Sequence, residues 1–147
     1  MKLTIKDITK IGFSEALGEL LKYSFPIKTT MQIAESTTII DTKLEEYAKI
    51  ENAKLDMYGK KDENNKLVKK DIMNMPGRSI VEFATKEDED KYINEMNEVK
   101  KKEIEIPLSE PIDIIEVEKR HKELKKPFDV TPETIINLGK LVKPLKG

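Results

Sequence analysis

The sequence predicts a mostly helical α+β fold formed by a single domain, residues 1–147. Apolar residues recur at helical spacing over an unusually long stretch, from Pro26 to about Lys60. Apolar and polar residues alternate in Glu103–Leu108, which is typical of a strand, and Thr131-Pro132 is a helix-start signal near the C-terminus. We therefore expect a long antiparallel helical hairpin, a small antiparallel β-sheet beside it and a C-terminal docking helix.

Composition limits the classes of function. The chain has 147 residues, a net charge of −1 and no cysteine, and 37% of its residues are charged. The balanced charge argues against bulk nucleic-acid binding, and the lack of cysteine excludes disulfides and thiolate sites. A single histidine excludes a site with two imidazoles. No apolar run approaches the roughly 18 residues that span a bilayer. We expect no membrane partner, no metal and no cofactor, and a location in the cytosol.

The N-terminal region predicts the first arm of the hairpin. The alternation at Leu3–Ile5 indicates either a short strand or an entry segment. Asp7 is placed to cap a helix over Ile8–Tyr23. The segment Tyr23–Pro26 forms a short corner to the next helix, and short connections favour antiparallel helices.

The long helix begins at Pro26, which is pre-set for a first helical turn, with Ser24 as its cap, and it ends at Gly59. About 33 residues at 1.5 Å each give a rod of roughly 50 Å. Its apolar stripe drifts around the axis, and Leu44 lies where the two halves of the stripe overlap. Since the preceding and terminal helices cannot cover such a stripe, we expect a homo-oligomer.

The middle of the chain predicts a hairpin or loop at the far tip of the helices. A polar turn, Gly59–Asn65, is followed by short apolar pieces that end in Ile72–Met75. Met75–Arg78 contains Pro-Gly, a strong turn signal, and Ser79–Ala84 has the pattern of a strand. The next helix is expected to start after its N-cap, Thr85, and to run to about residue 101, with acids in its first turn.

The C-terminal third completes the predicted sheet and adds a last helix. The β-branched segment Ile112–Val117 is expected to pair with Glu103–Leu108, while Glu118–Lys126 is either helix or loop. Thr131 caps a helix that starts at Pro132 and ends near Val142. The face expected to dock consists of Ile135, Ile136, Leu138, Leu141 and Val142.

Several of these features occur together in a known pattern. They are the corner Phe25-Pro26-Ile27-Lys28, the long Glu- and Lys-rich helix, the run Tyr58–Asn64, the alternating Glu103–Ile106 and the terminal Thr131-Pro132-Glu133 helix. The chain resembles a family of small proteins of unknown function encoded by bacteriophages of Gram-positive and gut bacteria. The segment around Ile112–Lys126 is longer than in that family. The resemblance implies a phage origin, but it implies no activity and transfers no functional residue.

A basic run near the C-terminus is the first candidate binding site. Lys119, Arg120, His121 and Lys122 open the run Lys119–Lys126. Such a cluster either cradles the phosphates of a nucleotide-sized anion or forms a solvated face of alternating charge. A metal site at His121 lacks a second ligand of suitable type.

Other candidates are less specific. Arg78 follows a rigid turn and suits an anion or a partner carboxylate, or is an ordinary exposed turn residue. The acidic run Glu87–Asp90 lacks the spacing of a calcium loop and suits the helix dipole. The tyrosines at helical positions suit base stacking or core packing. We find no glycine-rich phosphate loop, nucleophile elbow or His-Glu-x-x-His motif, and expect no enzyme.

Two functions follow as hypotheses. The first is a non-catalytic phage accessory protein in the host cytoplasm that sequesters a host nucleotide signal, such as a cyclic nucleotide, or a host defence protein. The alternative is a structural or assembly protein of the virion, for which a long projecting helix is equally natural. An enzyme is a third hypothesis, with no residues that specify a reaction.

Overall fold

The longest element of the chain is helix α3, Ile27–Tyr58. The computed structural model, which describes residues 1–73 and 77–144, confirms the predicted long helix within two residues at each end. Gly59 ends it, and its N–H donates to the Leu55 carbonyl at 2.7 Å. A Cβ at Gly59 would lie 2.5 Å from that carbonyl and 2.6 Å from the Leu67 side chain, so only glycine fits there.

The chain divides into two compact units, and α3 contributes to both of them. The terminal unit consists of Met1–Leu44 and Lys102–Gly147, and the middle unit is Glu45–Lys101. The mostly helical α+β class is confirmed, since each unit combines helices with one two-stranded antiparallel sheet. That the chain forms a single domain stays a prediction.

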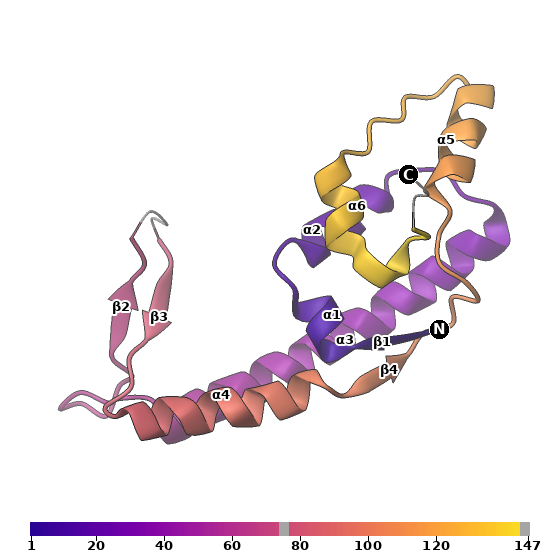
Figure 1. Cartoon of the computed structure of the whole chain (residues 1–147). Coiled ribbons are helices and arrows are strands. Elements are labelled where there is room, and N and C mark those ends of the chain that lie inside the picture. Colours follow the sequence, from indigo (N-terminus) through magenta and orange to yellow (C-terminus); the bar gives the residue numbers. More distant parts are fainter. Residues whose placement is uncertain (74–76, 145–147) are drawn as a thin grey trace. The chain divides into compact units, whose positions relative to one another are not determined.

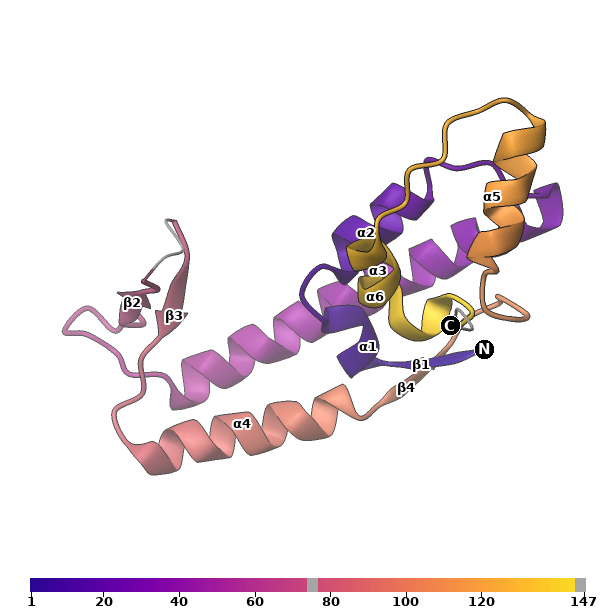
Figure 2. The same ribbon diagram turned by 45° about the horizontal axis from the view of Figure 1, so that its top comes forward.

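The terminal unit is built from short elements. Its sheet pairs β1, Lys2–Thr4, with β4, Glu103–Glu105, and Leu3 lies opposite Ile104 (Figures 1 and 2). Its helices, besides the first half of α3, are α1 (Ile5–Thr9), α2 (Phe13–Leu20), α5 (Ile114–Glu123) and α6 (Pro132–Leu138), with a 3₁₀ turn η1 at Gly139–Leu141. Helices α2 and α6 pack side by side.

The core of the terminal unit draws side chains from nearly every element. Phe13 and Leu20 of α2, Leu3 of β1, Ile40 of α3 and Leu138 of α6 are almost fully inaccessible to solvent. Burying such side chains contributes about 1.5–3 kcal/mol each before entropy is subtracted. The other buried apolar residues of the unit are Ile5, Ile8, Ala16, Leu17, Ile33, Ile104, Ile106, Leu108, Ile112, Ile114, Val117, Leu141 and Val142.

The predicted first helix is two helices. The first helix, α1, ends at Thr9, because its C-cap Lys10 leaves the helical region with a ψ of 138°. Gly12, whose φ of +88° is left-handed, is the N-cap from which α2 starts. The expected cap was also wrong. Thr4 is the N-cap of α1, and Asp7 completes a capping box by accepting from the Thr4 N–H at 2.8 Å.

The predicted pairing of Ile112–Val117 with the Glu103 strand was wrong. Asp113 caps helix α5 by accepting from the N–H groups of Ile115 and Glu116, so most of this β-branched segment is helical. The strand β4 pairs with β1 instead. Ile112 forms a single parallel bridge to Val142, next to the C-terminal 3₁₀ turn.

The C-terminal helix begins as predicted but is shorter. Thr131 is its N-cap and Pro132 its first residue, and α6 ends at Leu138 where the chain tightens into η1. Leu138, Leu141 and Val142 are buried and dock this segment, as expected. The prediction that Ile136 lies on the buried face was wrong, since its side chain is exposed.

The middle unit contains the second half of α3, a β-hairpin and α4, Lys86–Lys100, which starts after its N-cap Thr85 as predicted. Helix α4 runs antiparallel beside α3 in both views (Figures 1 and 2). The hairpin pairs β2, Lys69–Asp71, with β3, Ser79–Val81. The Met75-Pro76 part of the predicted turn lies outside the described residues. Leu44, expected at the centre of the buried stripe, is only half-buried.

Candidate functional site

Helix α5 carries four of the predicted binding residues, and its sequence decides which of them face solvent. Ile114, Val117 and His121 are buried at helical spacing, so they form the face that packs on the core. Lys119, Arg120 and Lys122 lie on the remaining faces and are exposed. The helix therefore presents its cations to solvent and its histidine to the interior.

His121 is a core residue whose two ring nitrogens are both occupied. Its exposed fraction is 2%. The ring Nε2 accepts from the Ser24 N–H at 3.0 Å, and Nδ1 lies 2.8 Å from the Val117 carbonyl. The first contact needs an acceptor and the second a donor, so these contacts assign the N–H of the ring to Nδ1. His121 therefore fixes the corner before α3, and neither ring nitrogen is free for a ligand or a metal.

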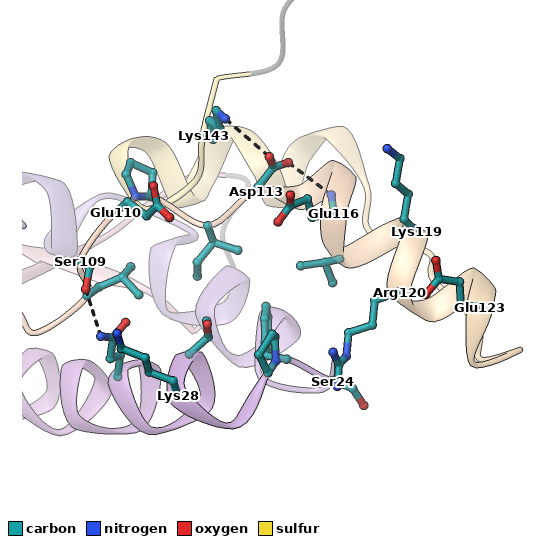
Figure 3. A pocket seen from close by; sticks show the side chains of 18 residues that line it. Ser24, Lys28, Ser109, Glu110, Asp113, Glu116, Lys119, Arg120, Glu123 and Lys143 are labelled. Atoms are coloured by element: carbon teal, nitrogen blue, oxygen red, sulfur yellow. Dashed lines mark hydrogen bonds and ion pairs between the residues drawn. The ribbon is translucent and has the colours of Figure 1, made fainter.

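A cleft of about 580 Å³ lies between the start of α3, the loop before α5 and α5 itself (Figure 3). Lys119 and Arg120 line it, whereas His121 and Lys122 do not. The Arg120 side chain extends from α5 toward Ser24, while Lys119 points away from α3. The volume suits a drug-sized or nucleotide-sized molecule, since ligand pockets usually measure 300–1,000 Å³.

The cleft carries opposite charges in equal number. Its cations are Lys28, Lys119, Arg120 and Lys143, and its carboxylates are Glu110, Asp113, Glu116 and Glu123. Of these eight charged residues, only Lys143 and Asp113 form an ion pair with a described residue, and the distance is 3.6 Å. The basic run in the sequence predicted only the cations Lys119 and Arg120 of this site. The loop before α5 and α5 itself add the four carboxylates to the lining of the cleft. Such a lining favours a ligand that has both an anionic group and hydrogen-bond donors.

The start of α3 adds positive potential to one wall of the cleft. Its first intrahelical hydrogen bond runs from the Thr30 N–H to the Pro26 carbonyl, so the preceding amides have no acceptor within the helix. Its first turn holds Lys28 and no acid. The helix dipole and Lys28 therefore act in the same direction, and together with Arg120 they favour an anion at this wall.

Contacts between segments hold the walls of the cleft in place. The Ser24 N–H bond to His121 joins the corner before α3 to α5. Gln32 of α3 donates to the Ser109 hydroxyl at 3.0 Å, which joins α3 to the opposite loop. Three segments far apart in the sequence are thus fixed before any ligand arrives, which lowers the entropy lost on binding.

The remaining candidates lie in the middle unit. Arg78 is exposed beside β3, in a different unit from Arg120. The acids of Glu87–Asp90 occupy the start of α4, where Glu87 pairs with Lys91 at 3.3 Å and Asp90 with Lys86 at 3.9 Å. Residues 1–73 and 77–144 contain no group of three or more acidic or histidine side chains that would hold a metal ion.

Two tyrosines mark the interior of the middle unit. Burial raises the pKa of Tyr92 to about 12, with the Glu51 carboxylate as the second cause. Burial likewise raises the pKa of Tyr47 well above its usual range, again with Glu51 contributing. Nearby, Lys54 of α3 pairs with Glu95 of α4 at 3.3 Å. These side chains join the two helices, so Tyr47 and Tyr92 serve packing.

Comparisons with protein-family models, curated proteins and solved structures give no match. The resemblance to phage-encoded proteins therefore stays a prediction from the sequence. Among the described residues, no helix is long and apolar enough to cross a membrane.

Proposed function

We propose that the protein acts by binding, without catalysis, and that the cleft between α3 and α5 takes a small molecule with both an anionic group and N–H donors. The observation that carries this proposal is the lining of the cleft. Arg120 and Lys28 have no ion-pair partner among the described residues, and neither have Glu110 and Glu116. Charges left unpaired in one preorganised cleft are available to a ligand.

A nucleotide meets this requirement. Its phosphate suits the Arg120 guanidinium and the start of α3, since both offer N–H donors to an anion. The amino and imino groups of a base suit the carboxylates of Glu110 or Glu116, which accept hydrogen bonds only. The proposed role, in line with the phage resemblance, is an accessory protein of the host cytoplasm that sequesters a cyclic or linear nucleotide.

Calorimetric titration with a nucleotide panel tests this proposal, with inorganic phosphate as a probe that offers only an anion. Arg120→Gln should weaken nucleotide binding roughly ten- to a hundred-fold, because it removes a charge-assisted contact. Glu116→Gln distinguishes a ligand that donates a hydrogen bond to Glu116 from a ligand that is only an anion. Binding weakens if a donor of the ligand meets Glu116, but strengthens if the ligand is only an anion, because a repulsive charge is removed.

Lys122→Gln is the matched control, since Lys122 is an exposed cation of the same helix that does not line the cleft. The Lys122→Gln variant should bind the nucleotide with the same affinity as the wild type. If no nucleotide binds below about 100 μM, the nucleotide-sequestering role fails. Stoichiometric copies of the protein in purified virions would instead favour the structural role.

A further inference from the structure

The β-hairpin of the middle unit carries unneutralised positive charge. Residues 69–81, from the start of β2 to the end of β3, contain three cations, Lys69, Lys70 and Arg78, and one acid, Asp71. None of these cations forms an ion pair with any described residue of the chain. The charge of the hairpin is therefore open to an external partner.

One face of the hairpin combines this charge with an exposed apolar side chain. Lys70 lies directly opposite Ile80 in the β2–β3 register, so the two side chains share a face. The Ile72 N–H donates to the Arg78 carbonyl at 3.1 Å, which continues the pairing toward the turn. Arg78 precedes Ile80 by two residues and thus lies on the same face. Ile80 is 55% exposed.

Helix α4 of the same unit carries the complementary pattern. It has six acids and three lysines. Glu89 and Asp90 precede Ile93 by four and three residues, so the three side chains are neighbours on the helix surface. Ile93 is 42% exposed. Glu89 has no ion pair in the described part of the chain, and Asp90 has only the exposed pair with Lys86 at 3.9 Å.

We propose that the middle unit binds a second copy of this chain, with the Lys70–Arg78–Ile80 face of each hairpin against the Glu89–Asp90–Ile93 face of α4 in the other copy. Each face offers two like charges and one isoleucine, and the two faces have opposite sign. In a two-fold dimer the hairpin of each copy contacts α4 of the other copy, so the same contact occurs twice. A surface that carries both faces is therefore complementary to itself. This inference is independent of the ligand proposed for the cleft.

The occupant is a protein rather than a nucleic acid because the acids of α4 belong to the same unit and would repel a phosphate backbone. A second copy would also explain why so few apolar side chains are buried within the middle unit. Within residues 45–73 and 77–101 only Met96 is a buried apolar side chain. Covering Ile80 and Ile93 in a dimer adds apolar contact that a single copy lacks.

Sedimentation velocity and native mass spectrometry on the full chain test the proposal. Two charge-reversed double variants are needed, Lys70→Glu with Arg78→Glu on the hairpin and Glu89→Lys with Asp90→Lys on α4. The wild type should dimerise. Each variant alone should dimerise at least about 100-fold more weakly, because like charges then face each other. A one-to-one mixture of the two variants should form a heterodimer, since its hairpins and α4 helices are again complementary.

The mixture also shows that the variants are folded, because unfolded chains would not restore a specific heterodimer. Lys122→Glu with Lys125→Glu changes two exposed cations that do not line the cleft. This control has an equal change of charge and should dimerise like the wild type. The proposal is overturned if the wild type is monomeric at about 1 mM. It is equally overturned if the variants dimerise like the wild type, if the mixture stays monomeric, or if the wild type is a monomer that retains nucleic acid through the hairpin.

Discussion

The two units differ in what holds them together, although one helix contributes to both. Helix α3 buries Ile33, Ser36 and Ile40 in the terminal unit, and it buries no residue in the middle unit. There its contacts with α4 are half-buried tyrosines and the Lys54–Glu95 pair. A regular helix thus gains tertiary stability only where other segments cover its stripe. The terminal unit has the core, and the middle unit has the surface on which we expect a partner.

The largest expected loss of stability comes from a substitution that creates a cavity in the terminal unit. Leu20→Ala removes a fully buried side chain of α2 and should lower the free energy of unfolding by about 2–5 kcal/mol. Leu55→Ala in α3 is the matched change in the middle unit, where the side chain is only half-buried, and should cost about 1 kcal/mol or less. Urea unfolding measures both. Equal losses would show that the units do not differ as described.

The next effect concerns the corner before α3. His121→Phe keeps the packing but leaves the Ser24 N–H without its acceptor, and should cost about 1–3 kcal/mol. Amide exchange at Ser24 should accelerate in the variant. Lys122→Ala, the neighbouring exposed change, should stay within about 0.5 kcal/mol of the wild type. A fully stable His121→Phe with a protected Ser24 amide would contradict the role assigned to the ring.

A smaller, pH-dependent effect is expected at Asp7. Burial raises the pKa of this carboxyl, but hydrogen bonds from Thr4 and the nearby Lys140 outweigh it and lower the pKa below its ordinary value. The folded state therefore binds the proton less tightly than the unfolded state. The stabilisation is complete above the ordinary pKa and is lost as pH falls through the lowered value. Asp7→Asn should cost about 1 kcal/mol at neutral pH.

A pH series of chemical unfolding checks this sign. The difference between wild type and Asp7→Asn should shrink below about pH 4. A difference that stays constant down to acidic pH would show that the charge of Asp7 contributes nothing to the cap of α1.

The smallest effect belongs to the middle unit in alkaline solution. Because the pKa of Tyr92 is raised to about 12, the folded state holds its proton more tightly than the unfolded chain. This stabilisation is complete below about pH 10, the ordinary tyrosine value, and falls as pH rises toward the raised pKa. Tyr92→Phe should reduce that loss. Tyrosinate absorbance in the folded protein measures the titration, and a Tyr92 that ionises near pH 10 would contradict its burial.

The sequence predicted elements wherever a local signal marked their ends. Pro26 and Gly59 bound α3, and Thr85 and Thr131 cap α4 and α6, because caps and breakers act through their own backbone. Long-range pairing leaves no such signal. The partner of β4 is β1, about a hundred residues away, and only the fold brings them together.

The candidate site was predictable in part. Arg120 and Lys119 were found because they belong to a basic run, and they line the cleft. Glu110 and Lys28 come from distant segments that only the fold brings to the same cleft. A signal for the burial of His121 was present, since Ile114, Val117 and His121 follow helical spacing after a capping residue, Asp113. The β-branched composition of that segment favoured a strand instead.

The most direct test of the difference between the units is amide hydrogen exchange of the wild-type protein at low and high concentration. Exchange in α2 and α6 should be slow at both concentrations, because the core of the terminal unit is complete within one copy. Exchange in α4 and the β2–β3 hairpin should be fast in dilute solution and slow down as the protein dimerises. Equal protection of α4 and α2 at a concentration where the protein is monomeric would contradict the account.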